Sequence, residues 1–156
     1  MTIKKLLQSL VGHKVKFVVI GAWAFPSHGY SRATYDIDFF YEPTKANIKR
    51  IIAGLREAGY AGVEELTLDQ LTTKKTLFRQ YSQMTDIHPF VAGATFSEVW
   101  KRKKAATIEG VKIFVPSLED IIIMKKAAGR TKDLADLEVL EEIQRQKSAV
   151  AEKRIL

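Results

Sequence analysis

Residues 17–42 read FVVIGAWAFPSHGYSRATYDIDFFYE, and this stretch contains the pattern that decides the fold. From Arg32 to Tyr41 two sets of residues alternate, one of them apolar, which is typical of a strand with one buried face. On such a strand Asp36 and Asp38 point the same way, roughly 6–7 Å apart. Because carboxylates this close repel each other, the pair predicts a hard cation or a shared proton between them. Mg²⁺ is the expected ion, since it prefers oxygen and often binds through only one or two carboxylates.

The residues before the aspartates predict a phosphate site. Phe17–Ile20 is a short apolar run rich in β-branched residues, and it is interpreted as a buried strand. It leads into Gly21 and Ala22 and then into a short helix over residues 23–28, with Pro26 in its first turn. A glycine at such a turn lets the backbone approach a ligand, and the free N–H groups of the next helix favour an anion. We therefore expect phosphate opposite the aspartates.

Together these residues resemble a known signature, carried by Gly21-Ala22, Ala24, His28-Gly29, Arg32, Thr34 and Asp36-Ile37-Asp38. It is the signature of the nucleotidyltransferase superfamily with the DNA polymerase β-like core. The form is similar to that of small stand-alone proteins, which include relatives of AbiE-type toxins and antibiotic nucleotidyltransferases. Many members have Gly-Ser or Gly-Gly at the turn, so Ala22 lacks one hydroxyl contact to phosphate. The resemblance implies that Arg32 and the Gly21-Ala22 turn bind phosphates and that Thr34 orders the site.

A second segment, residues 116–140, reads PSLEDIIIMKKAAGRTKDLADLEVL and resembles the C-terminal part of the same proteins. Ser117 is a good helix start, and Gly129 is a good stop. The resemblance implies that three basic residues approach the nucleotide: Lys125, Arg130 and Lys132. It also implies that Asp133 and Asp136 hold the surrounding helices or basic groups. The alternative for the basic residues is a helix C-terminus stabilised by its dipole.

The third candidate carboxylate is Asp86. Leu77–Tyr81 and Met84–Val91 are predicted to be paired strands joined by Ser82-Gln83, and Asp86 shares a face with His88. The resemblance places a third carboxylate beside the first two, where it completes a second metal site or acts as base on the acceptor hydroxyl. The alternative is an ordinary aspartate at a strand end. We expect His88 to be a solvated strand-end residue, with a base as the alternative, and His28 to be capping or packed, with a catalytic role as the alternative.

The remaining patterns give the fold class, which is α/β (α+β) with a small mixed sheet flanked by helices. Expected helices cover residues 3–10, 44–58, 96–100, 117–128 and 131–143, and residues 61–76 form a loop with a short helix. A hairpin is expected over residues 105–115, around Glu109-Gly110. The basic run Lys101–Lys104 is either a solvated helix end or a phosphate-tracking patch. Residues 1–156 are expected to form a single domain. It is expected to end in a charged tail that begins at residue 144 and is most charged over about 147–156.

Composition agrees with one intracellular domain. The chain has 156 residues, 46% of them hydrophobic, which suits a single core. The absence of cysteine excludes disulfides and thiolate-bound zinc and favours a reducing cytoplasm. Neither a membrane span nor a signal peptide is expected. The net charge of +7 is compatible with RNA or a nucleoside triphosphate as partner.

The predicted reaction is Mg²⁺-dependent (or Mn²⁺-dependent) transfer of a nucleoside monophosphate from a triphosphate to an acceptor hydroxyl. RNA, a protein side chain and a small molecule are all compatible acceptors. Two other classes stay open. One is a non-catalytic nucleotide- or RNA-binding module, or half of a toxin–antitoxin pair. The other is a metal-dependent phosphodiesterase that uses the same carboxylates on water.

Overall fold

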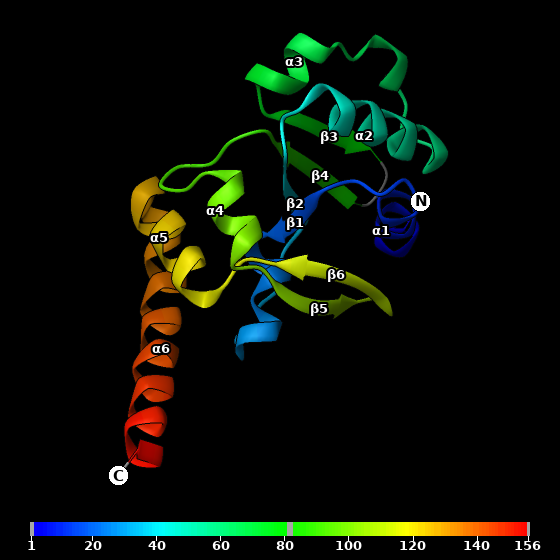
Figure 1. The fold of residues 1–156 in the computed structure, drawn as a ribbon. Helices are drawn as coiled ribbons and strands as arrows, with labels where there is room; N and C mark the ends of the chain where they lie inside the picture. Colours follow the sequence, from blue (N-terminus) through cyan, green and yellow to red (C-terminus); the bar gives the residue numbers. More distant parts are fainter. Residues whose placement is uncertain (1, 81–82, 156) are drawn as a thin grey trace.

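A mixed β-sheet forms the centre of the molecule (Figure 1). The computed structural model describes residues 2–80 and 83–155, and within them the sheet has four strands in the order β1-β2-β4-β3. The strands are β1 (Phe17–Ile20), β2 (Asp36–Tyr41), β3 (Thr76–Gln80) and β4 (Gln83–His88). β2 and β4 are parallel, and the outer pairs are antiparallel. β5 (Lys104–Ile108) and β6 (Val111–Val115) form a separate hairpin, as predicted.

Helices surround this sheet close to the predicted positions. They are α1 (Ile3–Gly12), α2 (Lys45–Glu57), α3 (Leu68–Thr73), α4 (Phe96–Lys101), α5 (Leu118–Ala128) and α6 (Leu134–Ile155), with 3₁₀ segments η1 (Gly21–Ala24), η2 (Pro26–His28), η3 (Val63–Glu65) and η4 (Thr131–Asp133). Thr44 and Ser117 cap α2 and α5 through their hydroxyls. None of the helices in the described ranges has the length and apolarity needed to cross a membrane.

The two faces of β2 have different environments. Ile37, Phe39 and Tyr41 are fully buried, and they pack in the main core with the apolar residues of α1 and α2. The opposite face carries the two aspartates at one end and Phe40 at the other. Phe40 belongs to a smaller cluster with Val18, Phe96 and Val99. One end of this face is thus sealed by apolar packing beneath α4, and the other end is left for polar groups.

Two predictions around this strand are wrong. The alternation predicted a strand from Arg32 onward, whereas β2 begins at Asp36 and Tyr35 is 83% exposed. β2 begins where its pairing with β4 begins, at Asp36 opposite Met84, and β1 reaches only as far as Asp38. The predicted helix over residues 23–28 is instead the pair of 3₁₀ segments η1 and η2, with Pro26 at the start of η2.

The C-terminal tail is helical and not irregular. α6 continues to Ile155 and extends away from the sheet, side by side with α5 only over its first part (Figure 1). Residues 144–155 are rich in good helix formers and contain neither glycine nor proline. The strand predicted to end at Val91 stops at His88, before Pro89. The predicted Ser82-Gln83 connection and the end of its first strand at Tyr81 fall partly outside the described residues.

A buried asparagine ties α2 to the sheet. Asn47 is 1% exposed, and its Oδ1 accepts a hydrogen bond of 2.8 Å from the Lys16 backbone N–H. Its Nδ2 donates to the backbone carbonyls of Lys16 and Glu42, both at 2.9 Å. One side chain therefore fixes the start of β1 and the end of β2 together.

We predict that Asn47→Leu lowers the free energy of unfolding by about 2–4 kcal/mol, because buried backbone groups lose their partners. Urea denaturation measures the change. Lys49→Leu, at an exposed position of the same helix, is the control and should stay near the wild-type value. A loss below about 1 kcal/mol for Asn47→Leu would mean that water replaces the side chain without cost.

Candidate functional site

A cavity of about 870 Å³ opens at the polar end of the sheet. All of the residues predicted to bind the substrate or the metal, or to act in catalysis, line it: Gly21, Ala22, Arg32, Thr34, Asp36, Asp38, Asp86, Lys125, Arg130 and Lys132. They come from the β1–η1 turn, the loop before β2, strands β2 and β4, and the segment from α5 to η4. The helix from Ser117 therefore ends at the cavity that holds the aspartates. The basic residues near its C-terminus share that cavity with the carboxylates.

The strand register brings the three carboxylates together. Asp38 lies directly opposite Asp86 in the parallel pairing of β2 with β4, and Asp36 precedes it on the same face. Each carboxylate has a different environment. The buried Oδ1 of Asp36 has no hydrogen-bond partner among the described residues. Oδ1 of Asp38 accepts a hydrogen bond of 2.9 Å from His88 Nε2, and Oδ1 of Asp86 accepts one of 2.6 Å from Arg79 Nη1.

The turn after β1 approaches Asp38 so closely that it requires glycine. Gly21 has a φ of +69°, and a Cβ added there would lie 3.0 Å from Asp38 Oδ2. Any other residue would have both a strained backbone and a contact with the carboxylate. The turn and the strand thus lie against each other in the lining of the cavity, and phosphate binding at this turn stays a prediction.

His88 differs from its predicted role. Its side chain is 15% exposed and donates to Asp38, so it is not a solvated strand-end residue. The signal for this was its parity with Asp86, which places both side chains on the cavity face. His28, in contrast, is packed as predicted, and its Nε2 donates to the Pro116 carbonyl at 2.9 Å. Burial lowers the pKa of His28.

Arg79 and Lys75 are the cations that sequence reasoning missed. Arg79 pairs with Asp86, and Lys75 Nζ lies 3.7 Å from the other oxygen of the same carboxylate. The cue was again parity, since Leu77 lies opposite Asp86 and Arg79 is two residues further along the same face of β3. That cue becomes usable only when the register between β3 and β4 is known.

Two buried aspartates organise the basic side of the cavity, as the resemblance implied. Asp136 accepts hydrogen bonds from Arg32, through Nε at 2.7 Å and Nη2 at 2.9 Å, and from Lys125 at 3.3 Å. Asp133 accepts from Lys125 at 3.0 Å and from Arg130 at 2.8 and 3.1 Å. Burial alone would raise the pKa of Asp133, but the hydrogen bonds from Arg130 and Lys125 outweigh it and lower this pKa to about 2.

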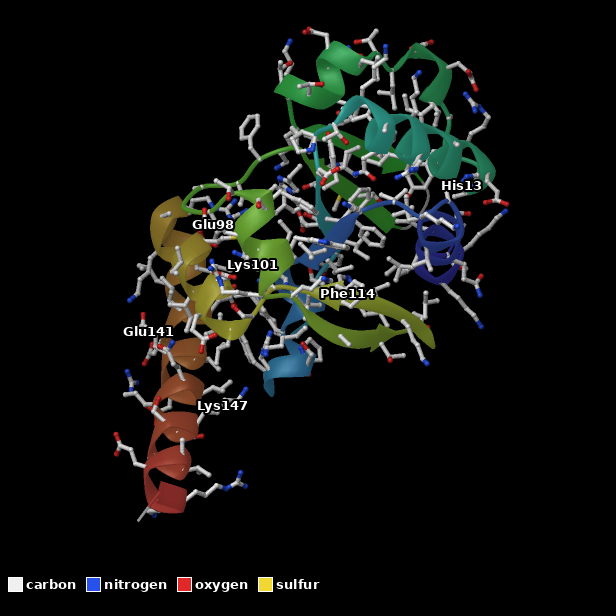
Figure 2. The ribbon with its side chains drawn as sticks, in the orientation of Figure 1. His13, Glu98, Lys101, Phe114, Glu141 and Lys147 are labelled. Carbon is white, nitrogen blue, oxygen red and sulfur yellow. The ribbon has the colours of Figure 1, made fainter. Side chains whose placement is uncertain are left out.

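The basic run Lys101–Lys104 lies elsewhere. Figure 2 shows Lys101 at the end of α4 and Phe114 on β6. Arg102 pairs with the buried Asp120 at 2.9 Å, and Lys103 Nζ lies 4.2 Å from the centre of the Trp100 ring. Two of the run's charges are therefore bound within the protein, and none of its residues belongs to the described lining of the cavity.

The carboxylates fit one divalent cation. Asp36 offers a buried, unpaired oxygen, and Asp38 lies on the same face beside it. Two carboxylates are a common protein contribution to a Mg²⁺ site, whose other ligands are water and phosphate. Among the residues that the structure describes, no cluster of three or more His, Cys, Asp or Glu side chains is arranged to hold a metal.

Two solved structures share this fold at low sequence identity. The antibiotic nucleotidyltransferase ANT(2″)-Ia, crystallised in complex with adenylyl-2″-tobramycin, has a TM-score of 0.58 and 16% identity, over 97% of this chain and 96% of that one. A Thermotoga maritima protein provisionally assigned as a nucleotidyltransferase has a TM-score of 0.51 and 16% identity, over 92% and 91%. The fold is therefore that of the nucleotidyltransferases.

The family follows from the sequence. Residues 1–153 match the model of the family described as "nucleotidyltransferase of unknown function" (DUF6036), and the chain belongs to that family. No curated protein matches the sequence. The superfamily and the fold class expected from the sequence are confirmed, and nucleoside monophosphate transfer is the general reaction that family and fold support.

The low pKa of Asp133 predicts an acid-sensitive contribution to stability. A carboxyl group whose pKa is depressed on folding stabilises the protein above its unfolded-state pKa, and this stabilisation is lost as the pH falls toward the folded-state value of about 2. Between pH 5 and pH 2 the wild type should lose about 2 kcal/mol more unfolding free energy than Asp133→Asn. Urea denaturation at each pH tests this, with the exposed Asp69→Asn as control. If the unfolding free energies of wild type and Asp133→Asn changed with pH in parallel, the ion pairs of Asp133 with Lys125 and Arg130 would make no such contribution to stability.

Proposed function

We propose that this chain transfers a nucleoside monophosphate from a nucleoside triphosphate to an acceptor hydroxyl, with Mg²⁺ or Mn²⁺ as cofactor. The observation that carries the proposal is the division of one cavity into a carboxylate wall on β2 and β4 and a basic wall at the end of α5. A metal–triphosphate complex has both kinds of charge and would contact both walls. The cavity volume of about 870 Å³ also suits a nucleotide-sized ligand.

The chain's residues would have separate roles in this reaction. Asp36 and Asp38 would hold the metal, which when bound neutralises phosphate charge and polarises the α-phosphate. The Gly21-Ala22 turn would bind phosphate through its backbone, beside Arg32 and the exposed Arg130 and Lys132. Thr34 lies two residues before β2 begins, and its hydroxyl hydrogen-bonds the backbone N–H and carbonyl of Asp36. It would keep the start of the strand ordered.

Asp86 would act on the acceptor. The acceptor hydroxyl would pass its proton to the carboxylate while its oxygen attacks the α-phosphorus. A new oxygen–phosphorus bond forms as the bond to the bridging oxygen of the β-phosphate breaks, and pyrophosphate leaves with the electron pair. Such a reaction depends on placing two substrates in line, which is a task for fixed groups on a sheet.

Two exposed aromatic side chains support a nucleobase site at the mouth of the same cavity. Tyr35 is 83% exposed and Phe90 is 60% exposed, and both line it. Exposed aromatic rings beside a phosphate site are the groups on which bases stack without sequence preference. We propose that one of them holds the base of the triphosphate or of an RNA acceptor.

Metal and triphosphate binding should be coupled through Asp36 and Asp38. Without a cation, each carboxylate repels the triphosphate. Calorimetry on the wild type should therefore show triphosphate binding that requires Mg²⁺, and the double change Asp36→Asn with Asp38→Asn should weaken it by about 10-fold or more. Asp69→Asn, remote from the cavity, should bind as the wild type does. Equal binding by wild type and double variant would remove the metal from this site.

Asp86 should matter for turnover and not for triphosphate affinity. Asp86→Asn keeps the shape of the side chain but accepts no proton, so the rate should fall by about 10² or more while the triphosphate affinity stays within a few fold. Single-turnover kinetics and calorimetry separate the two effects. A wild-type rate in this variant would exclude Asp86 from the reaction.

The decisive experiment uses α-³²P-labelled triphosphates with cellular RNA, proteins and aminoglycosides as acceptors, with and without Mg²⁺. Label on an acceptor, absent with the Asp36→Asn and Asp38→Asn double variant, supports transfer and identifies the acceptor class. Fragmented RNA without label would instead mean a phosphodiesterase. Triphosphate binding without label or fragments would mean a non-catalytic module, as in one half of a toxin–antitoxin pair.

A further inference from the structure

Asp86 differs from Asp36 because its charge is already matched by the chain. Its side chain is 7% exposed, Arg79 Nη1 lies 2.6 Å from one oxygen, and Lys75 Nζ lies 3.7 Å from the other. Asp36, on the neighbouring strand, keeps a buried oxygen with no partner in the described ranges. Carboxylates of the same site thus fall into two kinds, one already neutralised and one still open to a cation.

The fold places the guanidinium of Arg79 where it interacts electrostatically with all three carboxylates, those of Asp86, Asp36 and Asp38. β3 is antiparallel to β4, with Arg79 opposite Met84 and Leu77 opposite Asp86, so the guanidinium reaches diagonally back to the carboxylate. Its pKa is raised, first by the hydrogen bond to Asp86 and further by the charges of Asp86, Asp36 and Asp38, against the effect of burial. Arg79 also donates to the Phe78 carbonyl at 3.3 Å, which fixes its direction.

We propose that Arg79, assisted by Lys75, takes the place of a second metal ion, so that the cavity accepts one divalent cation, on Asp36 and Asp38. Asp86 is then a residue for the acceptor and not a metal ligand. This inference rests on the proposed function, because it assigns the metal stoichiometry of that same site. It separates the two roles that remained open for the third carboxylate.

Charge balance explains why a second ion does not fit. The three carboxylates carry three negative charges, and Arg79 with Lys75 return two positive charges within ion-pair distance of Asp86. One divalent cation therefore already takes the group past neutrality. A second ion between Asp38 and Asp86 would also have to displace a charge-assisted hydrogen bond of 2.6 Å, which is among the stronger polar contacts in proteins.

The competing explanation is that the Arg79–Asp86 pair only fastens the edge strand β3 to β4. Such a structural role predicts lower stability when Arg79 is changed, but no change in the number of metal ions bound. The number of ions therefore distinguishes the two explanations, whatever happens to stability.

The test is a titration of the full chain with Mn²⁺ in the absence of nucleotide. Binding is measured as the decrease of the free Mn²⁺ signal in electron paramagnetic resonance. The wild type should bind one Mn²⁺ per chain, and the double change Asp36→Asn with Asp38→Asn should bind none. Arg79→Gln combined with Lys75→Gln should bind two. The single variant Arg79→Lys retains the positive charge, so it should bind one Mn²⁺ per chain, as the wild type does.

Two further variants keep the test decisive. Arg56→Gln removes another exposed, ion-paired arginine, remote from the cavity, and should still bind one ion. Asp86→Asn in the otherwise wild-type chain should also bind one ion, and this result stands even if the Arg79 variants fail to fold. Two equivalent ions in the wild type, loss of an ion in Asp86→Asn, or one ion in folded Arg79→Gln with Lys75→Gln would each overturn the inference.

These outcomes are separable from the proposed function. Two ions in a chain that still labels an acceptor would overturn the role of Arg79 and leave nucleotidyl transfer intact. One bound ion in a chain that labels no acceptor would support the role of Arg79 and overturn nucleotidyl transfer.

Discussion

The need to hold like charges side by side governs this structure. The parallel pairing of β2 with β4 sets Asp38 directly opposite Asp86, and Asp36 lies on the same face, two residues before Asp38 and opposite Met84. Carboxylates at such spacing repel each other unless each has a counter-charge or a donor. His88 supplies the donor for Asp38, and Arg79 supplies the charge for Asp86. The apolar side of β2, buried in the main core, holds the strand in place against the remaining repulsion.

The basic wall of the cavity follows the opposite rule. Here Asp133 and Asp136 are buried, and they hold cations that come from a loop before β2, from α5 and from the turn after it. Each guanidinium or ammonium keeps part of its charge facing the cavity, while a carboxylate behind it fixes its position. A phosphate that enters would meet donors whose positions are already set, so less ordering is required on binding.

Features that depend on neighbouring residues in the sequence could be predicted, whereas the register between the strands could not. Alternating apolar residues located β2 and its buried face, and the glycine of the β1 turn was identified from its place between strand and helix. The ion pair between Arg32 and Asp136 was not predicted, because no periodicity links two such distant segments. The family resemblance implied only that Asp136 holds the surrounding helices or basic groups. His88 and Arg79 were misjudged or missed because their roles depend on which residues face them across neighbouring strands. The length of β2 was misjudged for the same reason, since its start is set by the pairing of Asp36 with Met84 on β4.

A site that carries its own counter-charges can fold before its ligands arrive. Asp38 and Asp86 have partners within the chain, whereas the buried Oδ1 of Asp36 has none among the described residues and therefore carries a desolvation cost. A metal–triphosphate complex that satisfies this oxygen would bind the folded chain and not the unfolded one, and would stabilise it by mass action. The same oxygen would therefore link nucleotide binding to stability, while the carboxylate beside Arg79 stays available for the acceptor. Because all three residues are aspartates on adjoining strands, the separate roles proposed for them would come from their neighbours alone.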